Sequence, residues 1–382
     1  MLFRVVILGP EESRVGEAIS NMYRSLRARL ATPARWYGVL RRNTFARAVQ
    51  GSNSIEGYRV TTEDAMAAVE GEEPLLTRDE TWAAVVGYRV AMTYVLQLAK
   101  DGNFVFNEGF LRSLHYMMMQ YDLNKHPGNW RPGAIWVRDE AKGENVYEGP
   151  PAERVPGLVS ELIEYLKSKE DDDHAIVKGA MAHLNLAMIH PFSDGNGRMA
   201  RCLQTLVLAA RGIGDPTFSS IEEYLGRNTQ DYYNVLGEVG KGSWNPRNDT
   251  RPWLRFNLTA HYRQAATLIR RTKMISRLWN EMEREIKSRA LPERSILALH
   301  DAAVGYYVRS AHYKHIADVS KVVASRDLKA LVKSGLLLAK GERRGRIYLA
   351  SDYLREIGVR ISNDEPRQTV DPFQVKGELI VA

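Results

Sequence analysis

Apolar residues recur every three to four positions over most of the chain, which is the spacing of amphipathic α-helices. Before residue 290 the pattern predicts helices over residues 12–30, 38–56, 62–70, 79–100, 107–120, 153–168, 172–189, 196–211, 228–239 and 252–288. Residues 175–189 are apolar on nearly every face, which is typical of a helix in the middle of a bundle. The sequence therefore predicts a mainly α fold, a helical bundle built around that segment.

One segment breaks the helical pattern and alternates like a β-hairpin. Residues 134–138 and 145–148 flank a polar turn that contains Lys142 and Gly143. Prolines and glycines border the segment on both sides, so we expect the hairpin to stand apart from the neighbouring helices.

The pattern changes again near Pro292. Short helices are followed by a longer one over residues 320–334, then by apolar runs at 336–338 and 347–349 that flank a basic turn. A helix followed by a basic two-stranded ribbon is typical of a winged helix-turn-helix domain. After Ser362 the chain is polar and contains proline, so we expect a loosely ordered tail.

These changes divide the chain into four parts. We expect an N-terminal helical region at 1–105, a catalytic core at 106–290, a winged-helix domain at 291–360 and a polar tail at 361–382. Two or three folded domains suit a chain of 382 residues, because single cores rarely grow beyond about 250 residues.

Composition narrows the class of protein. With 44% hydrophobic and 26% charged residues, the chain resembles an ordinary soluble globular protein. Its single cysteine, Cys202, excludes an internal disulfide and a cysteine-cluster zinc site, and favours a reducing compartment such as the cytoplasm. The apolar opening residues lack the features of a signal peptide, and no apolar run approaches the length of a membrane span. The net charge of +7 suits a polyanionic partner without requiring one.

A dense set of small and polar residues directly follows the apolar helix, in the segment His190-Pro191-Phe192-Ser193-Asp194-Gly195-Asn196-Gly197-Arg198-Met199-Ala200-Arg201. Helix N-terminal N–H groups, two glycines and two arginines together form an anion site. Asp194 is a hard oxygen ligand that could hold Mg²⁺ between phosphates. His190 has a suitable intrinsic pKa to take a proton from a hydroxyl. The set favours phosphoryl or nucleotidyl transfer.

This segment resembles the signature of the Fic family, H-P-F-x-[D/E]-G-N-G-R-x-x-R, and meets every fixed position. The resemblance implies a nucleotidyltransferase that moves AMP from ATP to a Tyr, Thr or Ser hydroxyl of a target protein, or of the chain itself, with release of pyrophosphate. Family members with altered motifs transfer other groups, and the intact Gly-Asn-Gly-Arg favours AMP.

The resemblance also implies a role for each motif residue. His190 would be the general base, Phe192 would anchor the loop in the core, and Asp194 would bind Mg²⁺. The α- and β-phosphates would be bound by Gly195, Asn196 and Gly197, and the β- and γ-phosphates by Arg198 and Arg201.

Upstream, Ser52-Asn53-Ser54-Ile55-Glu56-Gly57 resembles the inhibitory motif of the family, [S/T]-x-x-x-E-[G/N]. Ser52 and Glu56 lie one turn apart on a helix that Gly57 would end. A glutamate near a helix C-terminus is disfavoured by the helix dipole and needs a partner. The resemblance names Arg201 as that partner, so that Glu56 would block the γ-phosphate clamp. The alternative is a surface glutamate at an ordinary helix end.

Two further segments have implied roles. The hairpin, with Ile135, Trp136 and Val137, resembles the flap that holds a target chain by strand addition, although a purely structural hairpin is the alternative. Residues 223–233 resemble the segment that lines the adenosine pocket, where Asn228 and Tyr232 would cover one face of the base.

Alternatives for the function stay open. The first reading is an adenylyltransferase held off by Glu56. The second is a de-AMPylase in which Glu56 positions a water at the same site. The third is a DNA-binding regulator whose Fic core is secondary, and its basic wing would contact phosphates through Lys340, Arg343, Arg344 and Arg346. The sequence settles neither the target nor the oligomeric state, a homodimer included.

Overall fold

The predicted helices form close to where the apolar periodicity places them. In the computed structural model they are α1 (Pro10–Ala31), α2 (Tyr37–Ile55), α3 (Thr62–Glu70), α4 (Asp79–Leu98), α5 (Glu108–Met119), α6 (Val155–Lys167), α7 (Ala175–Ile189), α8 (Asn196–Ala210), α11 (Thr229–Gly240) and α12 (Arg251–Ser288). The structure describes residues 1–382 except 33, 75, 76, 78, 140–142, 170–173, 214, 343, 344, 368, 369, 376–378 and 380–382. The fold is mainly α, as predicted.

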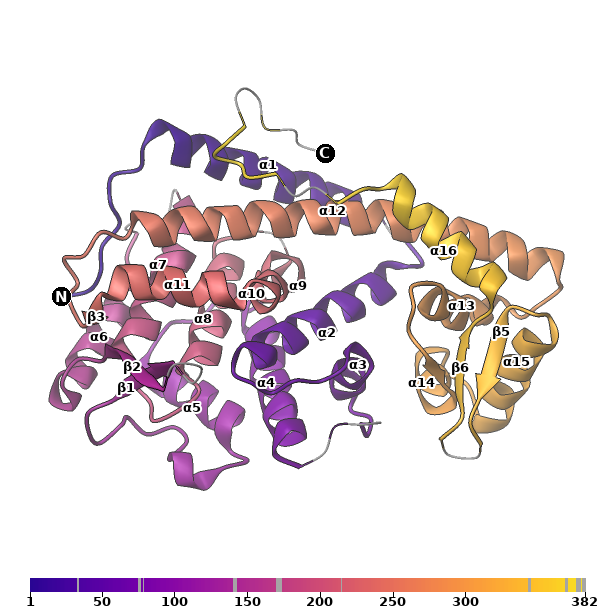
Figure 1. Ribbon diagram of the computed structural model, residues 1–382, viewed down its shortest axis with the longest axis horizontal. Coiled ribbons are helices and arrows are strands. Elements are labelled where there is room, and N and C mark those ends of the chain that lie inside the picture. Colours follow the sequence, from indigo (N-terminus) through magenta and orange to yellow (C-terminus); the bar gives the residue numbers. More distant parts are fainter. Residues whose placement is uncertain are drawn as a thin grey trace.

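The most apolar segment lies at the centre of the bundle (Figure 1). All residues of α7 except Ala187 are buried, and α6, α8 and α12 surround it. Burial of such a segment stabilises the fold by about 25 cal/mol for each Å² of apolar surface removed from water. The position matters for the site, because the residues after α7 begin inside the core.

Two short helices were missed from the sequence: α9 (Pro216–Ser219) and α10 (Glu222–Arg227). Helix α10 packs against α2 without side chains between the two backbones. A Cβ atom on Gly226 would lie 2.5 Å from Cα of Gly51, and one on Gly51 would lie 2.4 Å from the carbonyl oxygen of Glu222. Both glycines are therefore required, and together they fix the C-terminal part of α2.

The predicted hairpin is present as β1 (Trp136–Asp139) and β2 (Glu144–Glu148). The strands are antiparallel, with Trp136 opposite Glu148 and a register shift after Val137. A two-residue strand, β3 (Gly242–Ser243), adds to β2 in parallel, so β1 stays at the edge of the sheet. Lys142, which we placed in the turn, lies outside the described residues.

The C-terminal part of the chain forms a separate module of helices around a small sheet (Figure 1). Its elements are α13 (Ile296–Ala303), β4 (Val308–Arg309), α14 (Ser310–Ile316), α15 (Lys321–Lys333), β5 (Leu337–Lys340), β6 (Ile347–Ala350) and α16 (Asp352–Asp364). The antiparallel sheet has the order β4-β6-β5. This order agrees with the winged-helix prediction, which stays a prediction. Arg343 and Arg344 of the basic wing lie outside the described residues.

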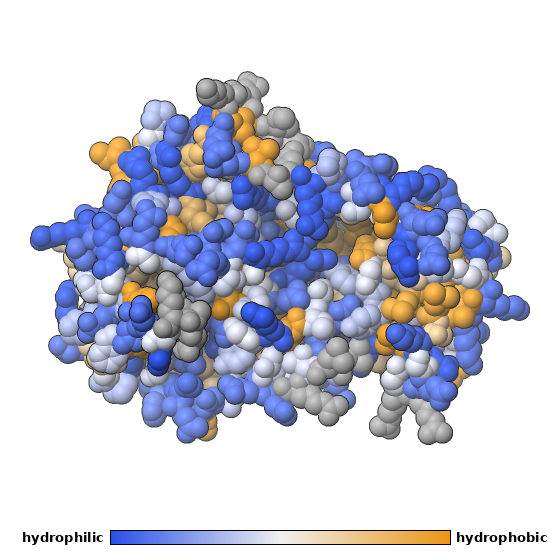
Figure 2. Space-filling model, in the orientation of Figure 1, coloured by the Kyte–Doolittle hydropathy of each residue, from blue (hydrophilic) through white to orange (hydrophobic). Residues whose placement is uncertain are grey.

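One face of this module exposes apolar side chains. Figure 2 shows hydrophobic residues gathered where β5 and β6 lie, and Leu338 of β5 is half exposed. The α16 helix was not predicted: most of it lies in the stretch 291–360 assigned to the winged-helix domain, and only its end reaches the polar tail.

The tail beyond residue 361 was expected to be loosely ordered, and this stays a prediction. Among its described residues, helix α16 continues to Asp364, and the segment 370–375 makes contacts with α1 and α12. Arg14 donates to the carbonyls of Pro372 and Val375, and the guanidinium of Arg255 lies 4.7 Å from the ring centre of Phe373. Among the described residues, no helix combines the length and the apolar character that a membrane span requires.

Candidate active site

His190 ends α7 in a left-handed conformation, with φ 52° and ψ 58°. Its Nδ1 lies 3.0 Å from the carbonyl oxygen of Ala187. Because a carbonyl only accepts, Nδ1 carries the proton and Nε2 presents its lone pair. Burial lowers the pKa of the imidazole below its usual value, so the ring is neutral at pH 7 and able to accept a proton.

Asn196 closes the loop that follows. Its Oδ1 accepts from the backbone N–H of Phe192 and its Nδ2 donates to the carbonyl of Phe192, both at 2.9 Å. Both the oxygen and the nitrogen of the side-chain amide are thus engaged in hydrogen bonds within the loop. What Asn196 can offer an anion is its backbone N–H, in the first turn of α8.

Phe192 anchors the loop, as predicted, but the residue beneath it was missed. The Phe192 ring is buried and stacks on His115 of α5 at 3.7 Å between ring centres. Nδ1 of His115 accepts from Gly128, so Nε2 carries the proton and donates to the carbonyl of Asp194 at 3.0 Å. Burial lowers the pKa of His115 to about 4, which keeps this arrangement neutral. His115 therefore positions the acidic residue of the loop.

Arg131 holds the other half of the loop and was also missed. Its Nε donates to the carbonyl of His190 at 2.8 Å, and its backbone N–H donates to Pro191 at 2.9 Å. Neither His115 nor Arg131 has a local sequence signal, because each lies far along the chain from the loop that it supports.

The two glycines of the motif allow close approaches that a side chain would block. Gly195 has φ 75°, and a Cβ atom there would lie 3.0 Å from Sδ of Met119. A Cβ on Gly197 would lie 2.4 Å from Oε1 of Glu56. The space above Gly197 is therefore the space that the Glu56 carboxylate now fills.

Arg198 and Arg201 are both buried, at 0% and 1% exposure. The Arg198 guanidinium lies 5.1 Å from the ring centre of Tyr58, and its Nη2 is 3.4 Å from the hydroxyl of Tyr121. Nε and Nη1 of Arg198 and Nη1 of Arg201 find no hydrogen-bond acceptor among the described residues. Buried donors on a permanent charge are costly to leave unpaired, so the site favours an anionic ligand.

The inhibitory motif meets Arg201 directly. Nη2 of Arg201 donates to Oε1 of Glu56 at 2.7 Å and to the carbonyl of Ser52 at 3.0 Å. Nε of Arg201 donates to the Ser52 hydroxyl at 2.7 Å. Glu56 is the C-cap of α2, and Gly57 follows with φ 85°. The structure thus brings Ser52 and Glu56 of the predicted inhibitory motif to the second arginine, and Gly57 follows at the end of the helix.

Asp194 lies at the rim of this site, with a third of its side chain exposed. Its Oδ1 accepts from Gly195 N–H at 2.6 Å, and its Oδ2 is 3.6 Å from Nζ of Lys125, in the short 3₁₀ helix Leu123–Lys125. A single accessible carboxylate beside an anion site fits Mg²⁺, which is commonly held by one or two carboxylates together with substrate phosphates.

The hairpin lies over the end of α7. The hydroxyl of Tyr147 in β2 donates to the carbonyl of Met188 at 2.9 Å, two residues before His190. Of the predicted flap residues, Trp136 is 51% exposed and Ile135 and Val137 are partly buried. β1 lies at the edge of its sheet, and its use for strand addition stays a prediction.

The expected adenosine contacts need correction. Tyr232 is buried, and its hydroxyl lies 2.9 Å from Nε2 of the core residue His183. Its ring therefore cannot cover a base in this structure. Asn228 uses its amide to donate to the carbonyl of Tyr224. Tyr233 is 42% exposed, and its hydroxyl donates to Ile55 beside Glu56, so the neighbouring tyrosine faces the site.

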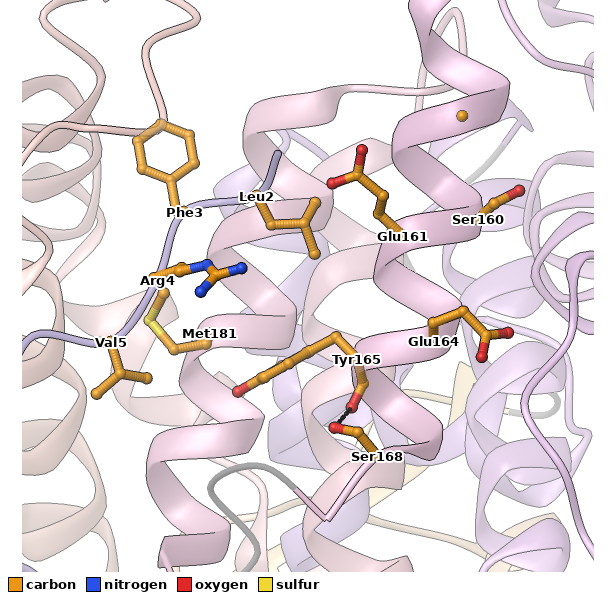
Figure 3. A pocket seen from close by; sticks show the side chains of 11 residues that line it. Leu2, Phe3, Arg4, Val5, Ser160, Glu161, Glu164, Tyr165, Ser168 and Met181 are labelled. Carbon is orange, nitrogen blue, oxygen red and sulfur yellow. Dashed lines mark hydrogen bonds between the residues drawn. The ribbon is translucent and has the colours of Figure 1, made fainter.

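A cavity of about 500 Å³ lies elsewhere, between the N-terminal segment and helices α6 and α7 (Figure 3). Leu2, Phe3, Arg4 and Val5 line one side, and α6 supplies Glu161, Glu164 and Tyr165 on the other. None of the predicted site residues lines it.

Comparison with known proteins identifies the domain. Residues 105–208 match the Fic/DOC family. The chain is 28% identical over 214 residues to the protein adenylyltransferase Fic of Nematostella vectensis. The matched region covers 54% of this chain and 44% of that protein. It is 32% identical over 125 residues to a probable protein adenylyltransferase of Aquifex aeolicus, covering 28% of this chain and 36% of the other. The chain thus spans less than half the length of these relatives.

Solved structures extend the likeness in fold over most of the chain. A Fic family protein from Desulfovibrio desulfuricans G20 superposes with a TM-score of 0.58 at 22% identity, covering 92% of this chain and 98% of the other. Residues 134–508 of Fic-1 from C. elegans superpose with a TM-score of 0.54 at 20% identity. The superposition covers 68% of this chain and 74% of the other. The fold is therefore of the Fic type.

Proposed function

We propose that this chain, which carries a Fic/DOC domain over residues 105–208, is a protein adenylyltransferase that Glu56 holds in an inhibited state. The observation that supports the proposal best is Arg201, a buried guanidinium whose Nη2 is occupied by Glu56 at 2.7 Å while its Nη1 stays unpaired. Phosphate oxygens would satisfy these donors better than a single carboxylate does, because they are more highly charged. The names of the relatives add support for AMP as the transferred group.

In the proposed reaction, ATP phosphates take the place of the Glu56 carboxylate above Gly197. Arg198 and Arg201 bind the β- and γ-phosphates, and Asp194 holds Mg²⁺, which would offset phosphate charge. Nε2 of His190 takes the proton from a target hydroxyl. The hydroxyl oxygen bonds to the α-phosphorus, the bond from that phosphorus to the bridging oxygen breaks, and pyrophosphate leaves.

The proposal predicts which part of ATP reaches protein. Incubated with Mg²⁺, the Glu56→Gly variant should incorporate label from ATP labelled at the α-phosphate and none from ATP labelled at the γ-phosphate. The proposal includes modification of the chain by itself, so label on the chain is the readout and no partner needs to be known. Label from the γ-position would instead show phosphate transfer and contradict the proposal.

The same experiment tests the removal of AMP. If Glu56 positions a water beside the α-phosphorus, adding wild-type chain to α-labelled protein releases labelled AMP. The position of Glu56 above Gly197 supports this second reaction at the same site. Release by wild type but not by Glu56→Gly would assign Glu56 to hydrolysis rather than to inhibition alone.

DNA binding is a second candidate function, and the exposed face of α15 favours it. Its exposed side chains are Lys321, Val322, Arg326, Lys329 and Lys333. Its one acidic residue, Asp327, is buried and receives hydrogen bonds from Arg294 at 2.6 Å and Tyr313 at 3.1 Å. The outward face therefore carries only positive charge, as expected of a helix that contacts phosphates.

For this function we predict that Arg326→Ala weakens binding to a DNA duplex in a mobility-shift assay. Loss of one phosphate contact should lower the slope of log affinity against log salt by about 1. Arg284→Ala is a matched control, because Arg284 is as exposed as Arg326 but lies on α12. Equal binding by both variants would exclude the α15 face as a DNA contact.

A further inference from the structure

Four charged side chains join α2 and α3 to the C-terminal module, and we name them the clasp: Arg42 of α2, Glu70 of α3, Asp301 of α13 and His312 of α14. Nη2 of Arg42 donates to both Asp301 oxygens, at 2.9 and 2.8 Å. Nε of Arg42 lies 3.4 Å from Glu70. His312 bonds to Glu70 through Nδ1 and to Asp301 through Nε2.

The clasp is a balanced set of charges rather than a metal site. Both nitrogens of His312 face carboxylates, so both carry protons. Burial disfavours the imidazolium, yet the bonds from Asp301 and Glu70 raise the pKa of His312 to about 9. Two cations therefore meet two anions. Although Glu70, Glu72 and His312 lie close enough to hold a metal ion, no nitrogen of His312 has a free lone pair for one.

An apolar contact lies beside the clasp. Tyr306, in the loop between α13 and β4, is buried against Ala46 of α2 and against Ala65 and Met66 of α3. Its hydroxyl accepts a hydrogen bond from Arg47 of α2. The module therefore packs on α2, whose C-terminal end carries the predicted inhibitory motif, and on α3, which follows it in the chain (Figure 1).

Helix α2 connects the clasp to the active site. Arg42 and Glu56 are 14 positions apart, which corresponds to roughly 21 Å along a helix. Helix α2 is held at three places: at the clasp, at the Gly51–Gly226 backbone contact, and at Arg201. Because a helix moves as a stiff unit about such a close contact, a displacement at Arg42 shifts Glu56 as well.

We propose that the C-terminal module regulates nucleotide transfer by bracing α2, so that opening the clasp withdraws Glu56 from Arg201. This inference rests on the proposed function. A partner that pulls on the module would act as an activator without touching the active site, because the clasp and Arg201 of α8 contact α2 toward its opposite ends.

The test uses the full chain and variants on both sides of the contact. Arg42→Met removes the α2 side of the clasp, and His312→Gln loosens it from the module side, where His312 bonds to Asp301 and Glu70. Each should raise self-labelling from α-labelled ATP by about fivefold or more, within the range of 5- to 150-fold known for allosteric coupling. Amide hydrogen exchange over residues 49–56 should become faster in both variants.

Arg277→Met is the matched control. Arg277 lies on α12 and pairs with Asp364 and Glu365 at the end of α16, so it contacts the C-terminal part of the chain away from α2. It should change neither the labelling nor the exchange. Labelling that rises equally with Arg277→Met would show nonspecific loosening and would overturn the proposal.

The Glu56→Gly variant, measured in parallel, distinguishes a failure of the proposed function from a failure of the regulatory role of the clasp. If Glu56→Gly takes up no label, the proposed function fails. If Glu56→Gly is labelled while Arg42→Met and His312→Gln both remain at the wild-type level with unchanged exchange in α2, then the clasp has no regulatory role and the proposed function stands. The exchange readout remains valid should a variant lose activity by unfolding, because unfolding raises exchange throughout the chain.

Discussion

Replacing His190 by alanine in the Glu56→Gly background is expected to lower AMP transfer about 10²–10⁴-fold, the usual cost of losing a general base. Nε2 of His190 is the unprotonated nitrogen, because Nδ1 is held by the Ala187 carbonyl. The residues proposed to bind the phosphates lie on α8 and in its preceding loop. ATP affinity should therefore change little, and the loss should fall on the rate of the chemical step.

The pH profile gives this prediction a second readout. Burial lowers the pKa of His190, so the base stays unprotonated to a lower pH than a free imidazole would. The rate should be flat around neutrality and fall only at a pH below about 6.5, the ordinary histidine value. In the alanine variant, this acidic limb should disappear along with the activity.

The control for His190 takes its backbone into account. Its φ of 52° is strained for alanine but is tolerated by asparagine, so His190→Asn removes the base while keeping the helix end. Both variants should be equally inactive and should bind ATP. If label persists undiminished in either, His190 is not the base.

The sequence predicted what depends on local pattern. Apolar periodicity placed the long helices within a few residues, and alternation found the hairpin of β1 and β2. The pairing of Glu56 with Arg201 was predicted from the resemblance to the Fic family and not from the residue pattern. Nothing in the residues around either position indicates a contact across 145 positions. The structure brings this pair together because the Gly51–Gly226 contact fixes α2 beside the core.

What could not be predicted depends on burial in three dimensions. Tyr232 and Tyr233 are adjacent on an amphipathic helix, and the sequence did not show that Tyr232 faces His183 while Tyr233 faces the site. His115 was one histidine in an apolar helix, without any sign of its bond to the Asp194 carbonyl. The clasp was invisible for the same reason, since its members come from four separate helices.

Glu56→Gly is expected to raise self-labelling from α-labelled ATP by about 5- to 150-fold, which corresponds to the 1–3 kcal/mol typical of coupling between two sites. The substitution removes the carboxylate that pairs with Arg201 and clears the space above Gly197. Glycine suits the end of α2, so the helix itself should remain.

The same variant should respond more strongly to nucleotide in thermal unfolding. Without Glu56, the buried Arg201 guanidinium loses its charged partner, and the free protein should melt at a lower temperature than the wild type. ATP with Mg²⁺ would restore an anion there, so its stabilising effect should be larger in the variant. Glu56→Gln, which keeps the shape and an acceptor oxygen but loses the charge, should fall between the two. If labelling does not rise in Glu56→Gly and its melting temperature responds to ATP no more than the wild type does, Glu56 does not compete with nucleotide for Arg201, and the autoinhibition is refuted.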